Sequence, residues 1–346
     1  MNKKFFMGIA AMAALTLVSC SSDDLDSVSD NSSKNEAISF DGYLGRSAVA
    51  VNGSRGSVLE IADLQKSKDG FGVFGNYNST GGQEFGSNLF NNVKVAYDAS
   101  AETKAWTYSP LKYWPTDGHV DFLAYAPRVD NKQLKGSSID FTVESDAANQ
   151  KDLLWANATS QTKANKTVTF NFKHALAKIG YKVQLNGDYT GTTIKLNKIT
   201  LAGSNDGKGT NKAFYKTGTI DLSYTSTTSS TTKLWTPSEE KQDFEWFSGD
   251  EQLSKTPAVE NPTTKYLFVI PQNFKTGTDQ LYVIVEYTIT YSDNTTVKTK
   301  VCKQLEKEFL QGKAYTINLT IGLTPIEFNA TVGGWGDIED YPITLE

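Results

Sequence analysis

One eleven-residue run decides the fold class: Leu281-Tyr282-Val283-Ile284-Val285-Glu286-Tyr287-Thr288-Ile289-Thr290-Tyr291. Every second residue from Leu281 to Tyr291 is apolar or aromatic, which is the period of a strand with one face in a core. The turn sequence Ser292-Asp293-Asn294 follows, and alternation resumes from Val297 to Val301. The sequence therefore predicts a long β-strand that returns through a tight turn as a hairpin.

Shorter runs of the same period recur on both sides of this hairpin, separated by Gly, Pro and Asn. They comprise Val73–Tyr77, Val120–Ala124, Ile139–Val143, Val168–Phe172, Ile179–Leu185, Ile194–Leu201, Tyr315–Ile321 and Phe328–Val332. Only Val58–Lys66 has the pattern of a helix, and it is brief. Within Ile194–Leu201 the alternation changes parity, which predicts a β-bulge. We expect an all-β fold of two antiparallel β-sandwich domains in series.

Length and composition support this expectation and exclude some functions. The 346 residues suffice for two domains, and we place them at residues 37–162 and 163–346. The 34 Lys and Arg residues are balanced by 39 Asp and Glu, so a nucleic-acid partner is not expected. Only two cysteines occur, Cys20 and Cys302, which excludes a cysteine metal cluster and favours a partly buried thiol at Cys302.

The N-terminal segment has the pattern of an export signal. A basic start is followed by an apolar run from Phe5 to Val18, too short to span a bilayer, which needs about 20 residues. The ending Leu17-Val18-Ser19-Cys20 resembles a bacterial lipobox, so we expect residues 1–19 to be a signal peptide and Cys20 to be acylated. The alternative is an ordinary signal peptide with a chance cysteine. Residues 20–36 are rich in Ser and Asp and predict a disordered tether.

The search for catalytic chemistry gives no candidate. The glycines Gly70, Gly72 and Gly75 match G-x-G-x-x-G, but the stretch itself has strand character and opens no helix, so it predicts no dinucleotide site. The only histidines, His119 and His174, lie at turns, where hydrogen bonds to local backbone explain them. Acidic neighbours such as Asp250-Glu251 indicate surface charge. We expect no catalytic residue, no metal and no cofactor.

The tryptophans leave one alternative function open. Trp235 and Trp246 lie in a weakly patterned stretch, whereas the other tryptophans lie among predicted strands. Exposed rings on a surface protein stack on sugars, so the alternative is a surface lipoprotein that binds glycans through Trp235 and Trp246.

An ordered series of motifs resembles the fimbrillin family of Bacteroidota. In chain order these are Ile38-Ser39-Phe40, Gly70-Phe71-Gly72-Val73-Phe74, Trp106-Thr107-Tyr108-Ser109-Pro110, Tyr113-Trp114-Pro115, Asp121-Phe122-Leu123-Ala124-Tyr125-Ala126-Pro127, Asp152-Leu153-Leu154-Trp155-Ala156, Phe170-Asn171-Phe172-Lys173-His174-Ala175-Leu176-Ala177-Lys178 and Gly312-Lys313-Ala314-Tyr315-Thr316-Ile317. The resemblance runs from about residue 37 to the C-terminus and implies that both sandwiches are transthyretin-like.

The resemblance also implies how such a subunit assembles. An arginine-specific or trypsin-like protease cuts after an Arg near the first strand, here Arg46 or Arg55, and removes the anchor together with that strand. The C-terminal tail of the next subunit then enters the vacated groove, a form of strand addition. In this chain the tail is residues 335–346, with apolar side chains at Ile338, Tyr341, Ile343 and Leu345. Pro342 interrupts its hydrogen-bonding potential.

The expected function is thus structural and non-enzymatic. We expect a shaft or tip subunit of a surface fimbria that supports adhesion or biofilm formation, polymerised head to tail with other fimbrial subunits. The precursor would be lipid-anchored in the outer membrane and the processed chain would belong to the fimbria. The sequence identifies no host or bacterial surface ligand.

Overall fold

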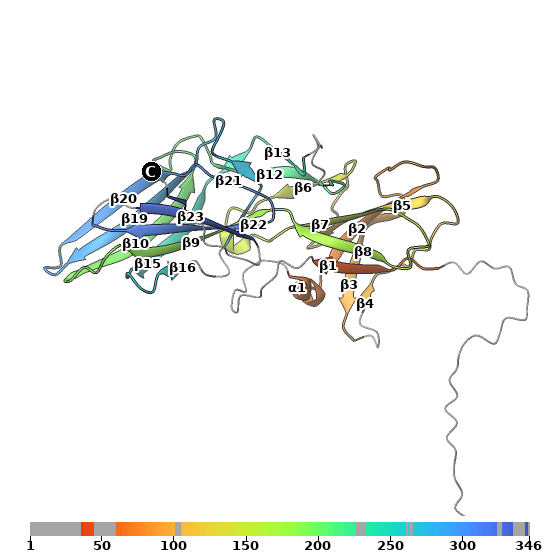
Figure 1. The fold of residues 1–346 in the computed structure, drawn as a ribbon, viewed down its shortest axis with the longest axis horizontal. Coiled ribbons are helices and arrows are strands. Elements are labelled where there is room, and N and C mark those ends of the chain that lie inside the picture. Colours follow the sequence, from red (N-terminus) through yellow and green to blue (C-terminus); the bar gives the residue numbers. More distant parts are fainter. Residues whose placement is uncertain are drawn as a thin grey trace, which may run out of the picture. The chain divides into compact units, whose positions relative to one another are not determined.

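A computed structural model describes residues 36–44, 60–100, 105–225, 233–260, 262, 266–323, 327–334 and 343–344, mainly as β-strands (Figure 1). The described helices are α1 (Ile61–Lys66) and the short 3-10 helix η1 (Ala147–Asn149). Helix α1 lies within the predicted helical stretch, and Glu60 and Asp63 form a capping box at its start. The structure confirms the all-β class.

The first sheet has seven strands in the order β1-β8-β7-β5-β2-β3-β4. Their bounds are β1 (Phe40–Leu44), β2 (Phe71–Asn78), β3 (Phe90–Asp98), β4 (Ala105–Thr107), β5 (His119–Ala126), β7 (Leu154–Gln161) and β8 (Val168–His174). Strand β2 contains Gly72 and Gly75, which confirms that the glycine motif is part of a strand. The central strands β2 and β5 are buried on nearly every residue, because apolar side chains pack on both faces of this sheet.

The remaining described strands form two larger sheets and three small ones. One larger sheet has the order β15-β10-β19-β20, with β10 (Thr192–Ala202), β15 (Phe244–Gln252), β19 (Tyr282–Tyr291) and β20 (Thr296–Gln304). The other has the order β16-β9-β22-β23-β24, with β9 (Ala177–Leu185), β16 (Val259–Glu260), β22 (Lys313–Ile321), β23 (Glu327–Gly334) and β24 (Ile343–Thr344), and β17 (Leu267–Val269) also pairs with β9. The first small sheet has the order β13-β12-β6, with β6 (Ser138–Thr142), β12 (Thr217–Asp221) and β13 (Trp235–Pro237). The second pairs β11 (Phe214–Tyr215) with β14 (Lys241–Gln242). The third pairs β18 (Gln272–Asn273) with β21 (Glu308–Phe309).

The predicted hairpin is strands β19 and β20, which pair from Tyr282↔Gln304 to Thr290↔Thr296. Asn294 adopts a positive φ of 66° in the turn, a conformation that Asn tolerates. The alternating side chains of β19 are buried as expected up to Ile289, whereas Tyr291 is exposed at the turn. The predicted bulge is also present, since the register of β10 shifts between Leu196 and Lys198 against both neighbours.

Among the strands that the structure describes, two pairs are parallel: β1 with β8, and β9 with β22. Parallel partners need a long connection, so local turn signals could not reveal these pairings. The pairing also crosses the predicted boundary at residue 162, because β8 belongs to the first sheet and β6 pairs with β12. The division into two domains remains a proposal, and strand pairing favours a boundary near the His174–Ala177 corner.

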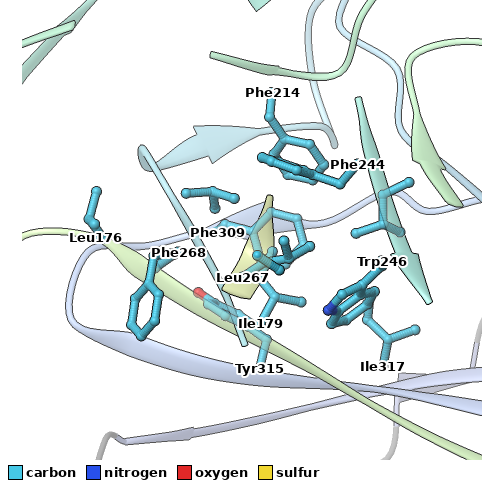
Figure 2. Close-up of a cluster of buried hydrophobic side chains, with 14 of the residues drawn as sticks. Leu176, Ile179, Phe214, Phe244, Trp246, Leu267, Phe268, Phe309, Tyr315 and Ile317 are labelled. Atoms are coloured by element: carbon cyan, nitrogen blue, oxygen red, sulfur yellow. The ribbon is translucent and has the colours of Figure 1, made fainter. Parts of the chain in front are cut away.

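Two apolar clusters fill the unit formed by residues 36–346. The smaller lies on one face of the first sheet and is rich in Phe. The larger combines the opposite face of that sheet, for example Phe74 and Trp155, with the later sheets. Figure 2 shows part of this larger cluster, where Trp246 and Tyr315 pack among aliphatic side chains.

Candidate assembly interface

Strand β1 is an edge strand of the first sheet (Figure 1). Its register with β8 runs from Phe40↔Val168 to Leu44↔Phe172. Ahead of it, Ile38 N donates to Lys112 O at 2.8 Å, and Tyr108 Oη donates to Ile38 O at 2.7 Å. Strand β1 is therefore hydrogen-bonded to one neighbouring strand, and the loop around Lys112, β4 and α1 contact it as well.

The side chain of Phe40 anchors β1 in the smaller cluster. Only 4% of Phe40 is exposed, and its ring centroid lies 5.3 to 5.7 Å from four others. These rings are Phe90, Tyr108, Phe122 and Phe170. Such edge and stacked contacts add about 0.5–1.5 kcal/mol per pair to the gain from burial.

The remaining positions of β1 alternate as an edge strand requires. Ile38 points into the cluster like Phe40, whereas Tyr43 is 48% exposed. A Cβ built on Gly42 would lie 3.5 Å from the Phe172 ring and 3.6 Å from Phe71. This is ordinary contact for a methyl group, so the Gly42 position has no room for a longer side chain. The resemblance led us to expect a removable first strand near Phe40, but not the ring contacts that hold it or the role of Gly42.

Most of the predicted processing and donor residues lie outside the described residues: Cys20, Arg46, Arg55, Ile338, Tyr341 and Leu345. Ile343 is the exception. It belongs to β24, where it pairs with Ala330 of β23, and Thr344 pairs with Asn329. This two-residue ladder is short beside the eight register pairs of β22 and β23.

The chain has a third arginine, Arg128, which sequence reasoning did not weigh. Its Nε donates to Asn92 O at 3.0 Å, its Nη1 pairs with Asp130, and its backbone N donates to Gly70 O. Because proteases bind extended and accessible backbone, these contacts protect the bond that follows Arg128. Arg46 and Arg55 are the other two possible sites for an arginine-specific protease.

The two tryptophans of the glycan alternative are buried, so the expectation that they lie in exposed loops is wrong. Trp235 is 6% exposed in β13, and its Nε1 donates to Ala175 O at 2.8 Å. Trp246 is 3% exposed in β15, and its ring lies 4.9 Å from that of Tyr181. Both rings fill the larger cluster, because pairing with distant strands turns them inward.

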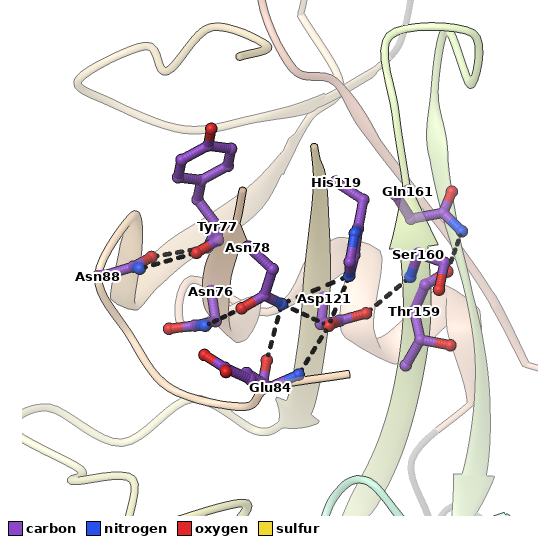
Figure 3. A network of polar contacts seen from close by, with 10 residues as sticks. All are labelled: Asn76, Tyr77, Asn78, Glu84, Asn88, His119, Asp121, Thr159, Ser160 and Gln161. Carbon is purple, nitrogen blue, oxygen red and sulfur yellow. Dashed lines mark hydrogen bonds and ion pairs between the residues drawn. The ribbon is translucent and has the colours of Figure 1, made fainter. Parts of the chain in front are cut away.

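Both histidines contact buried aspartates, whereas local backbone partners were expected. His174 Nδ1 lies 2.7 Å from Asp152 Oδ2, and His119 Nε2 lies 3.3 Å from Asp121 Oδ2. Figure 3 shows that Asp121 also accepts bonds from Asn78 Nδ2 and from the backbone N of Ser160. The Asp121 carboxylate thus ties together segments that are distant in sequence, and its oxygens are occupied by structural bonds.

Three further features of the described residues concern metal ligands, membrane-spanning helices and the thiol of Cys302. No group of three His, Cys, Asp or Glu side chains is arranged to hold a metal ion there. Within the same residues, no helix has the length and apolar character to cross a membrane. Cys302 is a free thiol of intermediate burial, as expected, and that burial raises its pKa. The fold and this site define an all-β protein with a peripheral strand seated in an aromatic core.

Comparison with known proteins gives the family. The model of the fimbrillin-like family matches residues 61–335, so the chain belongs to that family. It is 26% identical to the fimbrium subunit Fim1C of Phocaeicola vulgatus over 98% of both chains. The chain is therefore a structural fimbrial subunit of the cell surface that assembles with other fimbrial subunits, and it is not an enzyme.

Two solved structures show a partial likeness to this chain. One is a proposed cell adhesion protein from Bacteroides uniformis, with 17% identity and a TM-score of 0.49, covering 87% of this chain and all of the other. The second is the C-terminally truncated tip fimbrial protein Mfa3 from Porphyromonas gingivalis, with 10% identity and a TM-score of 0.37, covering 77% of this chain and 93% of the other.

Proposed function

We propose that β1 is the replaceable strand of a head-to-tail fimbrial polymer. The observation that carries the proposal is the position of Phe40, which is central to an aromatic cluster while its strand has β8 as its strand partner. A cut after Arg46 or Arg55 severs β1 from the rest of the domain. Departure of β1 then leaves an apolar groove and an unpaired β8 edge, which together bind an extended strand.

The C-terminal tail of another subunit is the proposed occupant. In its own subunit β24 makes only two register pairs, so its release breaks few backbone bonds. The apolar residues Tyr341, Ile343 and Leu345 have the two-residue spacing of the inward positions Ile38, Phe40 and Gly42. Since a longer side chain does not fit at Gly42, Leu345 does not lie there, so Ile343 occupies the place of Ile38 and Leu345 that of Phe40.

Acylation of Cys20 is the proposed route to the surface. The lipid holds the precursor at the outer membrane, and cleavage then separates the polymerising chain from its lipid. Labelling cells with a clickable palmitate analogue tests this step: wild-type precursor carries the label, and Cys20→Ser does not. A precursor labelled equally in both would remove Cys20 from the proposal.

Treatment of the detergent-purified full chain with an arginine-specific protease tests the processing step. The expected product begins at Ser47 or Gly56, and N-terminal sequencing distinguishes them. Arg46→Lys or Arg55→Lys abolishes the corresponding cut while keeping the charge. Arg128→Lys is the matched control, and it leaves the digestion pattern unchanged.

Oligomer formation is measured on the same digests by size-exclusion chromatography with light scattering. Wild-type digests form a ladder of oligomers, whereas digests of a chain truncated after Gly334 remain monomeric. If the complete digest stays monomeric at high protein concentration, or if truncation leaves the ladder intact, strand exchange by this tail is ruled out.

Disulfide crosslinking tests the register of the incoming strand. All variants carry Cys302→Ser. In a parallel arrangement, placing Ile343 at Ile38 brings Thr344→Cys beside Thr167→Cys. A crosslink to Thr169→Cys or to Asn171→Cys instead would place Leu345 or Ile343 at Gly42 and refute the steric argument.

A further inference from the structure

A cavity of about 350 Å³ lies beside β7 and β8, on the face of the first sheet opposite to Phe40. Its lining comes from β7, from β8 and from the segment after β12: Trp155, Ala156, Asn157, Asn171, Lys173, Tyr224 and Thr225. Its volume is within the range of about 300–1,000 Å³ that is typical of small-molecule sites.

The indole of Trp155 has an unsatisfied hydrogen bond. Only 2% of Trp155 is exposed, and its buried Nε1 has no hydrogen-bond acceptor among the described residues. The indole of Trp235, by contrast, reaches Ala175 O. A buried donor without an acceptor costs about 1–3 kcal/mol, so an acceptor supplied at this cavity would be bound favourably.

Two further donors are available at the same cavity. Lys173 Nζ lies 5.5 Å from the centre of the Trp155 ring, and neither Lys173 nor Asn171 makes a side-chain hydrogen bond or ion pair within the described chain. Both are exposed and lie two residues apart on β8, hence on one face. The lining residues include no Asp or Glu. The unused polar groups are therefore the Trp155 indole N–H, the cationic Lys173 ammonium and the Asn171 amide, which both donates and accepts.

An aromatic ring completes the cavity. The Tyr224 ring lies 5.9 Å from that of Trp155, and Asn157 Nδ2 holds the Tyr224 segment by donating to Leu222 O and Tyr224 O. A partly buried tyrosine ring beside hydrogen-bond donors suits a ligand with an apolar ring face and many oxygens.

We propose that this cavity binds a carboxylate-bearing sugar residue, such as a uronic or sialic acid. The carboxylate accepts from Trp155 Nε1 and from the Lys173 ammonium, a charge-assisted arrangement that is stronger than a neutral hydrogen bond. The sugar ring lies against Tyr224, and Asn171 donates to a hydroxyl group. The site is separate from the β1 groove, so it is available whether or not strand exchange takes place.

NMR of the full chain with ¹⁵N-labelled tryptophan tests the proposal directly, because each indole N–H gives its own signal. Trp155→Phe identifies the signal of Trp155. Titration with D-glucuronate or N-acetylneuraminate shifts this signal saturably, and D-glucose at the same concentration does not. Lys173→Gln, a surface change, weakens binding of the acidic sugars about tenfold, equivalent to about 1.4 kcal/mol. Lys298→Gln, on the exposed edge strand β20, is the control and leaves binding unchanged.

Three results would overturn the assignment. An unmoved Trp155 signal at saturating sugar means that the indole is hydrated and that the cavity is a solvent-filled cleft. Acetate binding as tightly as glucuronate reduces the site to a carboxylate subsite without sugar recognition. A tri-glutamate peptide binding more tightly than either sugar reassigns the cavity to acidic peptides.

Discussion

Replacing Phe40 by alanine isolates the contribution of the edge strand to stability. The substitution removes a nearly fully buried ring that contacts four other rings at 5.3 to 5.7 Å. Buried Phe→Ala changes cost about 3–5 kcal/mol, and the loss of several aromatic pairs favours the upper half of that range. Tyr43→Ala on the same strand is the matched control, with an expected cost of no more than about 0.5 kcal/mol because the side chain is half exposed.

Urea unfolding of the uncleaved chain measures both costs. Trp106 and Trp114 belong to the same cluster as Phe40, so their fluorescence reports on this part of the molecule. With a slope of about 1–3 kcal/mol per molar urea, a loss of 3–5 kcal/mol moves the midpoint down by at least about 1 M. If the transition is not two-state, the step reported by these tryptophans is compared between variants.

A small difference between the two variants would refute the reasoning. If Phe40→Ala and Tyr43→Ala shift the urea midpoint equally, β1 contributes little to the cluster. Its removal then leaves no apolar groove that stabilises an incoming strand. A large loss for Tyr43→Ala alone would show that the strand is seated with the opposite face inward.

Three further predictions concern the rest of the chain. Gly70→Ala places a Cβ 2.0 Å from Val95 O at a φ of +56°, so it costs more than about 2 kcal/mol in a thermal melt, whereas Gly81→Ala, with open space around it, is neutral. Asp121→Asn turns an acceptor into a donor within a buried network and costs about 1–3 kcal/mol by urea unfolding. Burial lowers the pKa of Lys178 from 10.5 to about 8, so the unfolded chain binds more protons between those pH values and the wild type gains stability as pH rises from 8 toward 10.5. Lys178→Met removes about 2 kcal/mol of that dependence, measured as the change in the free energy of unfolding between pH 7.5 and 9.5 in each protein.

Local alternation was enough to predict the strands whose pairing is also local. The β19 hairpin and the β10 bulge are both encoded within a few residues, by the turn at Ser292-Asp293-Asn294 and by the parity change after Leu196. The prediction that Gly72 and Gly75 lie in a strand succeeded for the same reason.

Features that depend on distant partners could not be predicted in this way. Trp235 looked exposed because its neighbours in sequence are polar, but β13 pairs with β12, which in turn pairs with β6 from the first half of the chain. The partner of His174 is the buried Asp152, 22 residues away, and nothing in the local sequence marks it. His119, by contrast, contacts Asp121 on its own strand. The cavity at Trp155 likewise depends on Tyr224, which reaches it from beyond β12.

Under the strand exchange proposed above, the arrangement of rings around Phe40 explains how a strand that contributes several kcal/mol is able to leave. Besides their contacts with Phe40, Phe90 and Phe170 each contact Phe122, at 5.4 Å and 6.5 Å respectively. When β1 leaves, these rings keep their mutual contacts, and the strands that carry them remain paired with their own neighbours. The free-energy cost of losing β1 is then the lost burial of one strand rather than the collapse of the sheet. An incoming strand with apolar residues at the same spacing restores that burial. Substituting Phe122, which lies within this ring network, would therefore destabilise the cleaved form as much as the precursor, whereas Phe40→Ala affects the precursor alone.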